Sequence, residues 1–162
     1  MPFNVSKCQV MHLGKDNTGF DHFIGNHKFE EVKEERDMGV QLTNNLKPPR
    51  QCQLAYSKAI KVPGMIGRTI SYNDADPLVR LYKSLVRQHL KYCVSTWSPS
   101  YIKDSKQLER LQHRYAAIMP KLKNEKRLKY LGLWTLEERR NRADLLEVFK
   151  MYKRLLITPF KN

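Results

Sequence analysis

The sequence predicts an α+β fold, in which a short β-hairpin region over residues 1–47 precedes a mainly helical region over residues 48–162. Before residue 47, apolar residues occur in short runs that glycines interrupt, which is typical of strands joined by tight turns. After residue 49, apolar residues recur every three or four positions, which is the period of an amphipathic helix. We therefore expect a small β region followed by a bundle of four to five helices.

Three segments of the first region carry strand signals. A first strand is expected near Val5–Met11, and a hairpin is expected around Gly25-Asn26, because this dipeptide favours a two-residue turn. Val40 and Leu42 alternate with polar residues and predict another strand. The stretch NNLKPP contains helix and strand breakers and ends the region.

The first two helices are expected over residues 49–70 and 77–97. Pro63 should end or kink the first, because proline has no N–H donor and its ring clashes with the preceding turn. Asn73, Asp74 or Asp76 could cap the second, with Pro77 in its first turn. Ser98-Pro99 should end it. Its predicted apolar face consists of Leu78, Leu81, Tyr82, Leu85, Val86 and Leu90.

Two further helices are expected after residue 100. Asp104 is the candidate cap of one, which Pro120 should end, and its predicted apolar face is Leu108, Leu111, Tyr115 and Ile118. Thr135 and Glu138 have the spacing of a capping box and predict the start of the last helix, which Thr158-Pro159 should end. Its predicted apolar face is Leu136, Ala143, Leu146, Phe149 and Met151 or Tyr152.

The positive charge is distributed unevenly along the chain. The net charge is +14, but residues 1–47 contain 6 Lys and Arg against 7 Asp and Glu, which leaves 24 against 9 for residues 48–162. A basic half indicates a polyanionic partner, nucleic acid first and an acidic membrane surface second. The alternative is a solvated basic surface that only keeps the protein in solution.

Several classes of protein are disfavoured. The sequence contains no run of 18 or more apolar residues, so no segment is expected to span a membrane. The first residues do not resemble a secretory signal. Cys8, Cys52 and Cys93 are too widely spaced for a disulfide framework, so we expect reduced thiols in the nucleus or cytosol and no secretion. No P-loop, GxGxxG or GxSxG motif is present, and no cofactor is expected.

Two groups of metal-compatible residues have weak spacings. Asp74 and Asp76 could bind a metal, but carboxylates are also preferred at the start of a helix. A second group, whose spacing departs from structural zinc sites, consists of Cys8, His12, His22 and His27. We predict no metal site.

Aromatic and basic side chains alternate in the second region. This pattern is typical of nucleic-acid surfaces, where bases stack on rings and cations contact phosphates. Tyr82 lies on a predicted apolar face and is expected in the core. Trp97 and Trp134 lie beside turns, and the sequence leaves open whether they are core or surface residues.

Five segments in order resemble one family. They are FNVSKCQVMHLG, EERDMGVQLTNNLK, SYNDADPLVRLYKSLVRQHLKYCVSTWSP, LERLQHR and LGLWTLEERRNRADLLEVFKMYK. Together they resemble the C-terminal part of reverse transcriptases of non-LTR (LINE-type) retrotransposons, of the jockey and chicken-repeat group. The resemblance covers nearly the whole chain and implies a palm edge, a primer grip and a thumb.

The resemblance assigns roles to several residues. Lys7 would match the lysine of the last palm strand, and Met38, Gly39 and Val40 would form the primer-grip hairpin, in which glycine allows close backbone approach. The thumb would hold the backbone of RNA or an RNA–DNA hybrid irrespective of sequence. The expected phosphate contacts are Arg80, Lys83, Arg87, Lys91, Arg139, Arg140 and Arg142.

The resemblance also implies what the chain lacks. Polymerisation requires two metal ions held by palm aspartates, and the family's Ala-Asp-Asp turn precedes the first matching segment. We therefore expect no polymerase activity from this chain alone. Pro63 and Gly67 depart from the family's apolar and basic residues, which indicates either drift or, at Pro63, a hinge.

Three functional hypotheses follow. The first is sequence-independent nucleic-acid binding, and the second is a retroelement remnant or interaction protein with no nucleic-acid ligand. The third is a polymerase subunit that a partner chain completes by supplying the palm.

Overall fold

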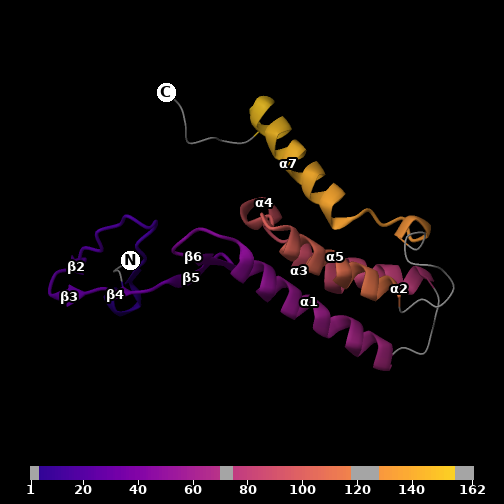
Figure 1. The fold of residues 1–162 in the computed structure, drawn as a ribbon, viewed down its shortest axis with the longest axis horizontal. Helices are drawn as coiled ribbons and strands as arrows, with labels where there is room; N and C mark the ends of the chain where they lie inside the picture. Colours follow the sequence, from indigo (N-terminus) through magenta and orange to yellow (C-terminus); the bar gives the residue numbers. More distant parts are fainter. Residues whose placement is uncertain (1–3, 70–74, 118–127, 156–162) are drawn as a thin grey trace. The chain divides into compact units, whose positions relative to one another are not determined.

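The computed structural model describes residues 4–69, 75–117 and 128–155 (Figure 1). The chain divides into two compact units, Met1–Gln51 and Cys52–Asn162. The division falls inside the first turn of helix α1 (Pro49–Thr69), whereas the boundary predicted from the sequence lies between residues 47 and 48. Short strands make up the first unit and helices the second, so the predicted α+β fold is confirmed.

Three pairs of strands form the first unit. Strand β1 (Gln9–Val10) pairs in parallel with β4 (Glu30–Glu31). Strands β2 (Phe23–Ile24) and β3 (His27–Lys28) form an antiparallel hairpin around Gly25-Asn26, which confirms the predicted turn. Strands β5 (Glu34–Asp37) and β6 (Val40–Thr43) form a second antiparallel hairpin.

The β5–β6 hairpin has a two-residue loop. Asp37 pairs with Val40, and the loop residues Met38 and Gly39 both have positive φ angles, of 44° and 83°. Two positive φ angles are the signature of a type I′ turn, whose twist matches that of the flanking strands. Glycine adopts this conformation without steric cost, which explains Gly39 at the second position.

The expected first strand is largely absent. Residues Val5–Lys7 form a 3-10 turn, so the expectation that Lys7 lies on a strand is wrong. Among the described residues of this unit, the buried side chains are Val40 and Gln51. The apolar residues Phe20 and Phe23 are exposed. Such short hairpins bury little surface and are marginally stable by themselves.

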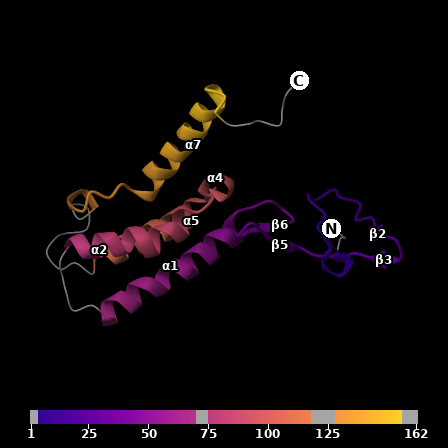
Figure 2. The ribbon, with the colours of Figure 1, turned by 180° about the vertical axis from the view of Figure 1, so that it is seen from behind.

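The second unit consists of helices, which Figures 1 and 2 show from two opposite sides. After α1 come α2 (Ala75–Leu81), a π-helical segment η2 (Tyr82–Val86), α3 (Arg87–Lys91) and α4 (Val94–Trp97). Then follow α5 (Ile102–Ala116) and α7 (Leu136–Tyr152). The helices α1, α2, η2, α3, α4 and α5 all contribute buried side chains to the core.

The π-helical segment keeps one face of the helix in the core. Leu78, Tyr82, Val86 and Leu90 are all buried and lie four residues apart. In a regular α-helix, each step of four residues advances about 40° beyond a full turn around the helix axis. A row of side chains spaced four apart would therefore turn gradually toward solvent. A π-helical turn contains more residues and reverses this rotation. The hydroxyl of Ser84 donates to the carbonyl oxygen of Arg80 beside the segment.

Two expectations about these helices are wrong, and a third is wrong in part. Helix α1 does not end at Pro63 but continues to Thr69, and the alternative of a kink at Pro63 stays a prediction. The helix expected to run unbroken to residue 97 is interrupted at Cys93, which has a φ of 48°. Helix α5 begins at Ile102 without a side-chain cap, so Asp104 lies in its first turn and is not its cap.

Other expectations are confirmed. Helix α4 ends at Trp97, before Ser98-Pro99. On α5, Leu108, Leu111 and Tyr115 are buried as predicted. Thr135 and Glu138 form the predicted capping box at the start of α7. The predictions for Asn73, Asp74, Ile118, Pro120 and Thr158-Pro159 lie outside the described residues.

The predicted apolar face of α7 is only partly buried. Leu136 is in the core and Ala143 is half-buried, but Leu146, Phe149, Met151 and Tyr152 are exposed. Arg140 is buried instead, and hydrogen bonds from Leu136 and Arg140, near the start of α7, join this helix to α5. In the second half of the helix, the large apolar side chains are exposed.

Candidate nucleic-acid interface

Three arginines from two helices lie close enough to influence one another. Arg87 begins α3, whereas Arg139 and Arg142 lie in the first two turns of α7. Burial lowers the pKa of the Arg139 guanidinium, and the positive charges of Arg87 and Arg142 lower that pKa further. Among the described residues, the ion pairs formed involve other side chains. We call Arg87, Arg139 and Arg142 the arginine cluster.

A small hollow lies beside this cluster. Arg87, Lys91, Arg139 and Arg140 line it, and its apolar walls are Leu90, Val94 and Leu136. Its volume is about 20 Å³, which is room for about one water molecule. The hollow cannot enclose a ligand, but it shows that α3 and α7 bring four of the predicted phosphate contacts to one place.

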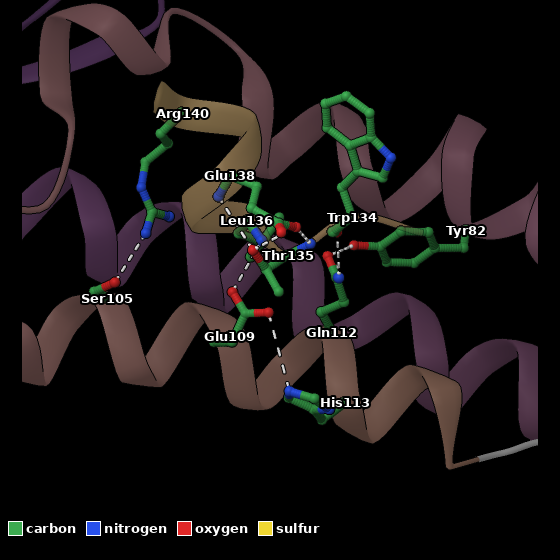
Figure 3. Close-up of polar contacts among 10 residues, drawn as sticks. All are labelled: Tyr82, Ser105, Glu109, Gln112, His113, Trp134, Thr135, Leu136, Glu138 and Arg140. Atoms are coloured by element: carbon green, nitrogen blue, oxygen red, sulfur yellow. Dashed lines mark hydrogen bonds and ion pairs between the residues drawn. The ribbon is translucent and has the colours of Figure 1, made fainter. Parts of the chain in front are cut away.

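Arg140 differs from its neighbours because it is only 8% exposed. Its Nη2 donates a hydrogen bond to the Ser105 hydroxyl on α5 at 2.8 Å (Figure 3). Arg140 and Asp104 also both influence the Cys52 thiol on α1, whose pKa burial raises to about 11. Arg140 therefore joins α7 to the interior and is poorly placed to contact phosphate.

A buried chain of hydrogen bonds fixes the residue before α7. Tyr82 donates its hydroxyl to Gln112 Oε1 at 2.6 Å, and Gln112 Nε2 donates to the Trp134 carbonyl oxygen at 2.8 Å (Figure 3). The rings of Tyr82 and Tyr115 lie 5.0 Å apart, and Tyr115 donates its hydroxyl to the Leu78 carbonyl. Burial strongly raises the pKa of Tyr82, so its hydroxyl stays protonated and donates.

Glu109 on α5 forms a hydrogen bond with the first turn of α7. Its Oε2 accepts a hydrogen bond from the Leu136 backbone N–H at 3.0 Å, a group that has no partner within the helix (Figure 3). Its Oε1 lies 4.0 Å from His113 Nε2. Burial raises the pKa of Glu109, and the hydrogen bond from Leu136 partly opposes this shift. The start of α7, which carries two of the clustered arginines, is therefore fixed from α5.

The two tryptophans have opposite environments. Trp97 is 2% exposed and its Nε1–H donates to the Tyr92 carbonyl oxygen at 2.7 Å, so it is a core residue. Trp134 is 46% exposed, and the guanidinium carbon of Arg142 lies 4.9 Å from its ring centroid. Trp134 is therefore the surface residue of the two, a distinction that the sequence left open.

The remaining predicted site residues lie elsewhere. Arg80 on α2 and Lys83 on η2 are exposed and do not line the hollow. Lys7 and Gly39 belong to the first unit. The predicted set is therefore divided. Of its members, Arg87, Lys91, Arg139 and Arg142 gather at one surface, and Arg140 is buried beside them.

The described residues hold no group of three His, Cys, Asp or Glu side chains that could bind a metal ion. The rings of His12 and His22 lie 5.6 Å apart, without a third ligand beside them. Asp76 is exposed in the first turn of α2. In the same part of the chain, no helix is both long and apolar enough to cross a membrane.

Comparison with known proteins gives no relative. No protein-family model, no curated protein and no solved structure matches the chain.

Sequence reasoning missed Gln112, Glu109 and the exposure of Trp134. Gln112 lies four residues after Leu108 and one after Leu111, so it falls on the apolar face of α5, and a polar residue there signals a buried hydrogen bond. Glu109 lies beside it. No local pattern separates Trp134 from Trp97, because burial next to a turn depends on tertiary packing.

Proposed function

We propose that this chain binds the phosphate backbone of RNA or RNA–DNA hybrid, irrespective of sequence, through the arginine cluster. One observation carries the proposal. Arg87, Arg139 and Arg142 are held together, and none forms an ion pair with a described carboxylate. Lys91 adds a fourth cation at the edge of the hollow.

Physical chemistry supports this choice of ligand. Like charges held close together repel, and a bound phosphate relieves that repulsion. A guanidinium presents a planar fork of donors that fits phosphate oxygens, so arginines suit this role better than lysines. Contacts to phosphate carry no base information, which makes the binding independent of sequence.

The resemblance to non-LTR retrotransposon reverse transcriptases supports the same function. In this proposal, α3 and α7 act as a thumb-like surface, and the β5–β6 hairpin, which has Gly39 in its two-residue loop, corresponds to the primer grip. We propose no polymerase activity for the chain alone, because the matching segments include no paired palm aspartates.

Charge-removing variants test this proposal. Binding of a labelled RNA–DNA hybrid is measured by fluorescence anisotropy for Arg139→Gln and Arg87→Gln. The matched control is Arg110→Gln, which removes one exposed arginine from α5 that does not line the hollow. Both cluster variants should bind several-fold more weakly, and the control should bind like the wild type. Equal weakening in all three would show that net charge alone matters and would refute the cluster.

One observation favours a second candidate function, an interaction protein or remnant with no nucleic-acid ligand. Exposed apolar side chains occur in both units, at Phe20, Phe23 and Ile24 and along the second half of α7. Apolar surface of this kind marks contacts with other chains or a tendency to aggregate. Folded, soluble protein without saturable hybrid binding would favour this candidate.

A further inference from the structure

Trp134 combines three features at the edge of the core. Nearly half of it is exposed, its backbone is fixed by Gln112, and a guanidinium lies over its ring. Figure 3 shows the indole pointing away from the Gln112 side chain. A large ring left half in water costs free energy, which contact with an apolar or aromatic partner would recover.

The contact with Arg142 links Trp134 to the arginine cluster. The guanidinium of Arg142 lies over the Trp134 ring. The positive charges of Arg142 and Arg87 both lower the pKa of Arg139. Arg87 and Arg139 line the same small hollow, and Arg142 follows Arg139 by three residues on α7, so the ring and the cations are neighbours at the start of this helix. Aromatic rings beside a basic groove are the usual arrangement for single-stranded nucleic acid, because bases stack while cations hold the phosphates.

Space for a flat group lies beside the ring. Trp134 lines a hollow of about 490 Å³, a volume within the usual range of about 300 to 1,000 Å³ for ligand pockets. The walls are partly apolar, from Leu128 and Leu133, and Lys129 contributes a cation. Arg142, whose guanidinium lies over the ring, is not among the residues that line this hollow.

We propose that Trp134 stacks on an unpaired nucleobase of a bound strand, while the arginine cluster holds that strand's phosphates. This inference rests on the proposed phosphate-binding function and names its ligand more closely. Bases in a duplex stack on each other and cannot reach the ring, so the site prefers single-stranded RNA or DNA, or an unpaired end, over a paired hybrid.

The two tryptophans make the proposal directly measurable. Intrinsic fluorescence is recorded while a single-stranded oligonucleotide is added to the wild type and to Trp134→Phe, in which buried Trp97 is the only tryptophan reporter. We expect marked quenching in the wild type and little in Trp134→Phe. An oligonucleotide of the same length with abasic sites, which keeps every phosphate, should quench neither protein.

Affinity gives the second readout. By anisotropy, Trp134→Leu should bind the normal oligonucleotide about 5- to 100-fold more weakly, since stacking of one base contributes about 1–3 kcal/mol. Its affinity for the abasic oligonucleotide should equal that of the wild type. The fold of each variant is checked by its cooperative urea unfolding.

The outcomes separate this inference from the proposed function. If normal and abasic strands bind equally well and Trp134 is not quenched, base stacking is refuted while phosphate binding stands. If no oligonucleotide binds, paired or unpaired, both are refuted. If the wild type binds the paired hybrid more tightly than the single strand, the stacking proposal is overturned as well.

Discussion

At the scale of single residues, Gln112 determines how the surface is built. It is 1% exposed and connects Tyr82 of η2 to the Trp134 carbonyl just before α7. A buried amide that satisfies two partners from two elements fixes their relative position more precisely than apolar contact does. Together with Glu109 and Ser105, which bind the first turns of α7, this side chain fixes the place of Trp134 and of the arginines that follow it.

Replacing Gln112 with leucine should destabilise the second unit. The Tyr82 hydroxyl and the Trp134 carbonyl would both lose their buried partner, and leaving such a group unpaired costs about 1–3 kcal/mol. Urea unfolding measures the loss, with exposed Gln53→Leu on α1 as the matched control. In the double variant with Tyr82→Phe, the cost should be less than the sum of the two. Full additivity would contradict the network.

Glu109 gives the second unit a distinct pH dependence. Burial raises its pKa in the folded protein above the ordinary value of 4.5, so the folded state binds the proton more tightly than the unfolded state. Its contribution to stability is therefore complete at low pH and is lost as pH rises through the folded-state pKa.

Comparison with Glu109→Gln isolates this contribution. The unfolding free energy of the variant minus that of the wild type should increase from pH 4 to pH 6, because the folded state disfavours the charged form of Glu109 only in the wild type. Urea unfolding at each pH gives the difference, and Glu35→Gln in the other unit controls for the loss of a carboxylate. A difference that falls or stays constant with pH would contradict the burial of Glu109.

At the scale of elements, local sequence patterns predicted where helices and turns occur better than they predicted the internal geometry of the helices. The capping box of Thr135 and Glu138 and the turn at Gly25-Asn26 were predictable because each depends on neighbours in the sequence. The continuation of α1 beyond Pro63 was not predictable from the local sequence, because a proline inside a helix removes a backbone hydrogen bond. The π-helical segment was not foreseen, since it results from the need to keep Tyr82 and Val86 in one core.

Helix α7 shows the same limit. Its apolar residues recur at helical spacing, yet most of them are exposed in the structure. A periodic pattern indicates which residues share a face, but not whether another element covers that face. Arg140 is buried for the complementary reason, since Ser105 lies opposite it.

Two glycines should respond oppositely to the same substitution. Gly67 lies in α1 with open space where an added methyl group would lie, so Gly67→Ala should stabilise by up to about 1 kcal/mol through helix propensity. Gly132 has a φ of 59°, so Gly132→Ala should destabilise by about 1 kcal/mol despite equal space. Urea unfolding measures both, and a shared sign would contradict the assigned backbone conformations.

At the scale of the whole molecule, the uneven charge is the property that the sequence predicted most directly. It indicated a polyanionic partner and placed the excess cations in the helical half. It did not indicate which cations meet, because Arg87 and Arg139 are 52 positions apart and come together only through the packing of α3 and α7. Lys7 and Gly39, which the resemblance joined to the same function, belong to the other unit.

The most direct test of phosphate binding by the arginine cluster is its salt dependence. Anisotropy with a labelled RNA–DNA primer–template is measured at about 50 and about 200 mM salt, for the wild type and for Arg87→Gln/Arg139→Gln/Arg142→Gln. Wild-type affinity should fall by orders of magnitude, because each neutralised phosphate releases counterions. The triple variant should bind weakly with a clearly smaller salt slope. Absence of saturable binding by the folded wild type at the lower salt, or an unchanged slope in the triple variant, would contradict the proposed interface.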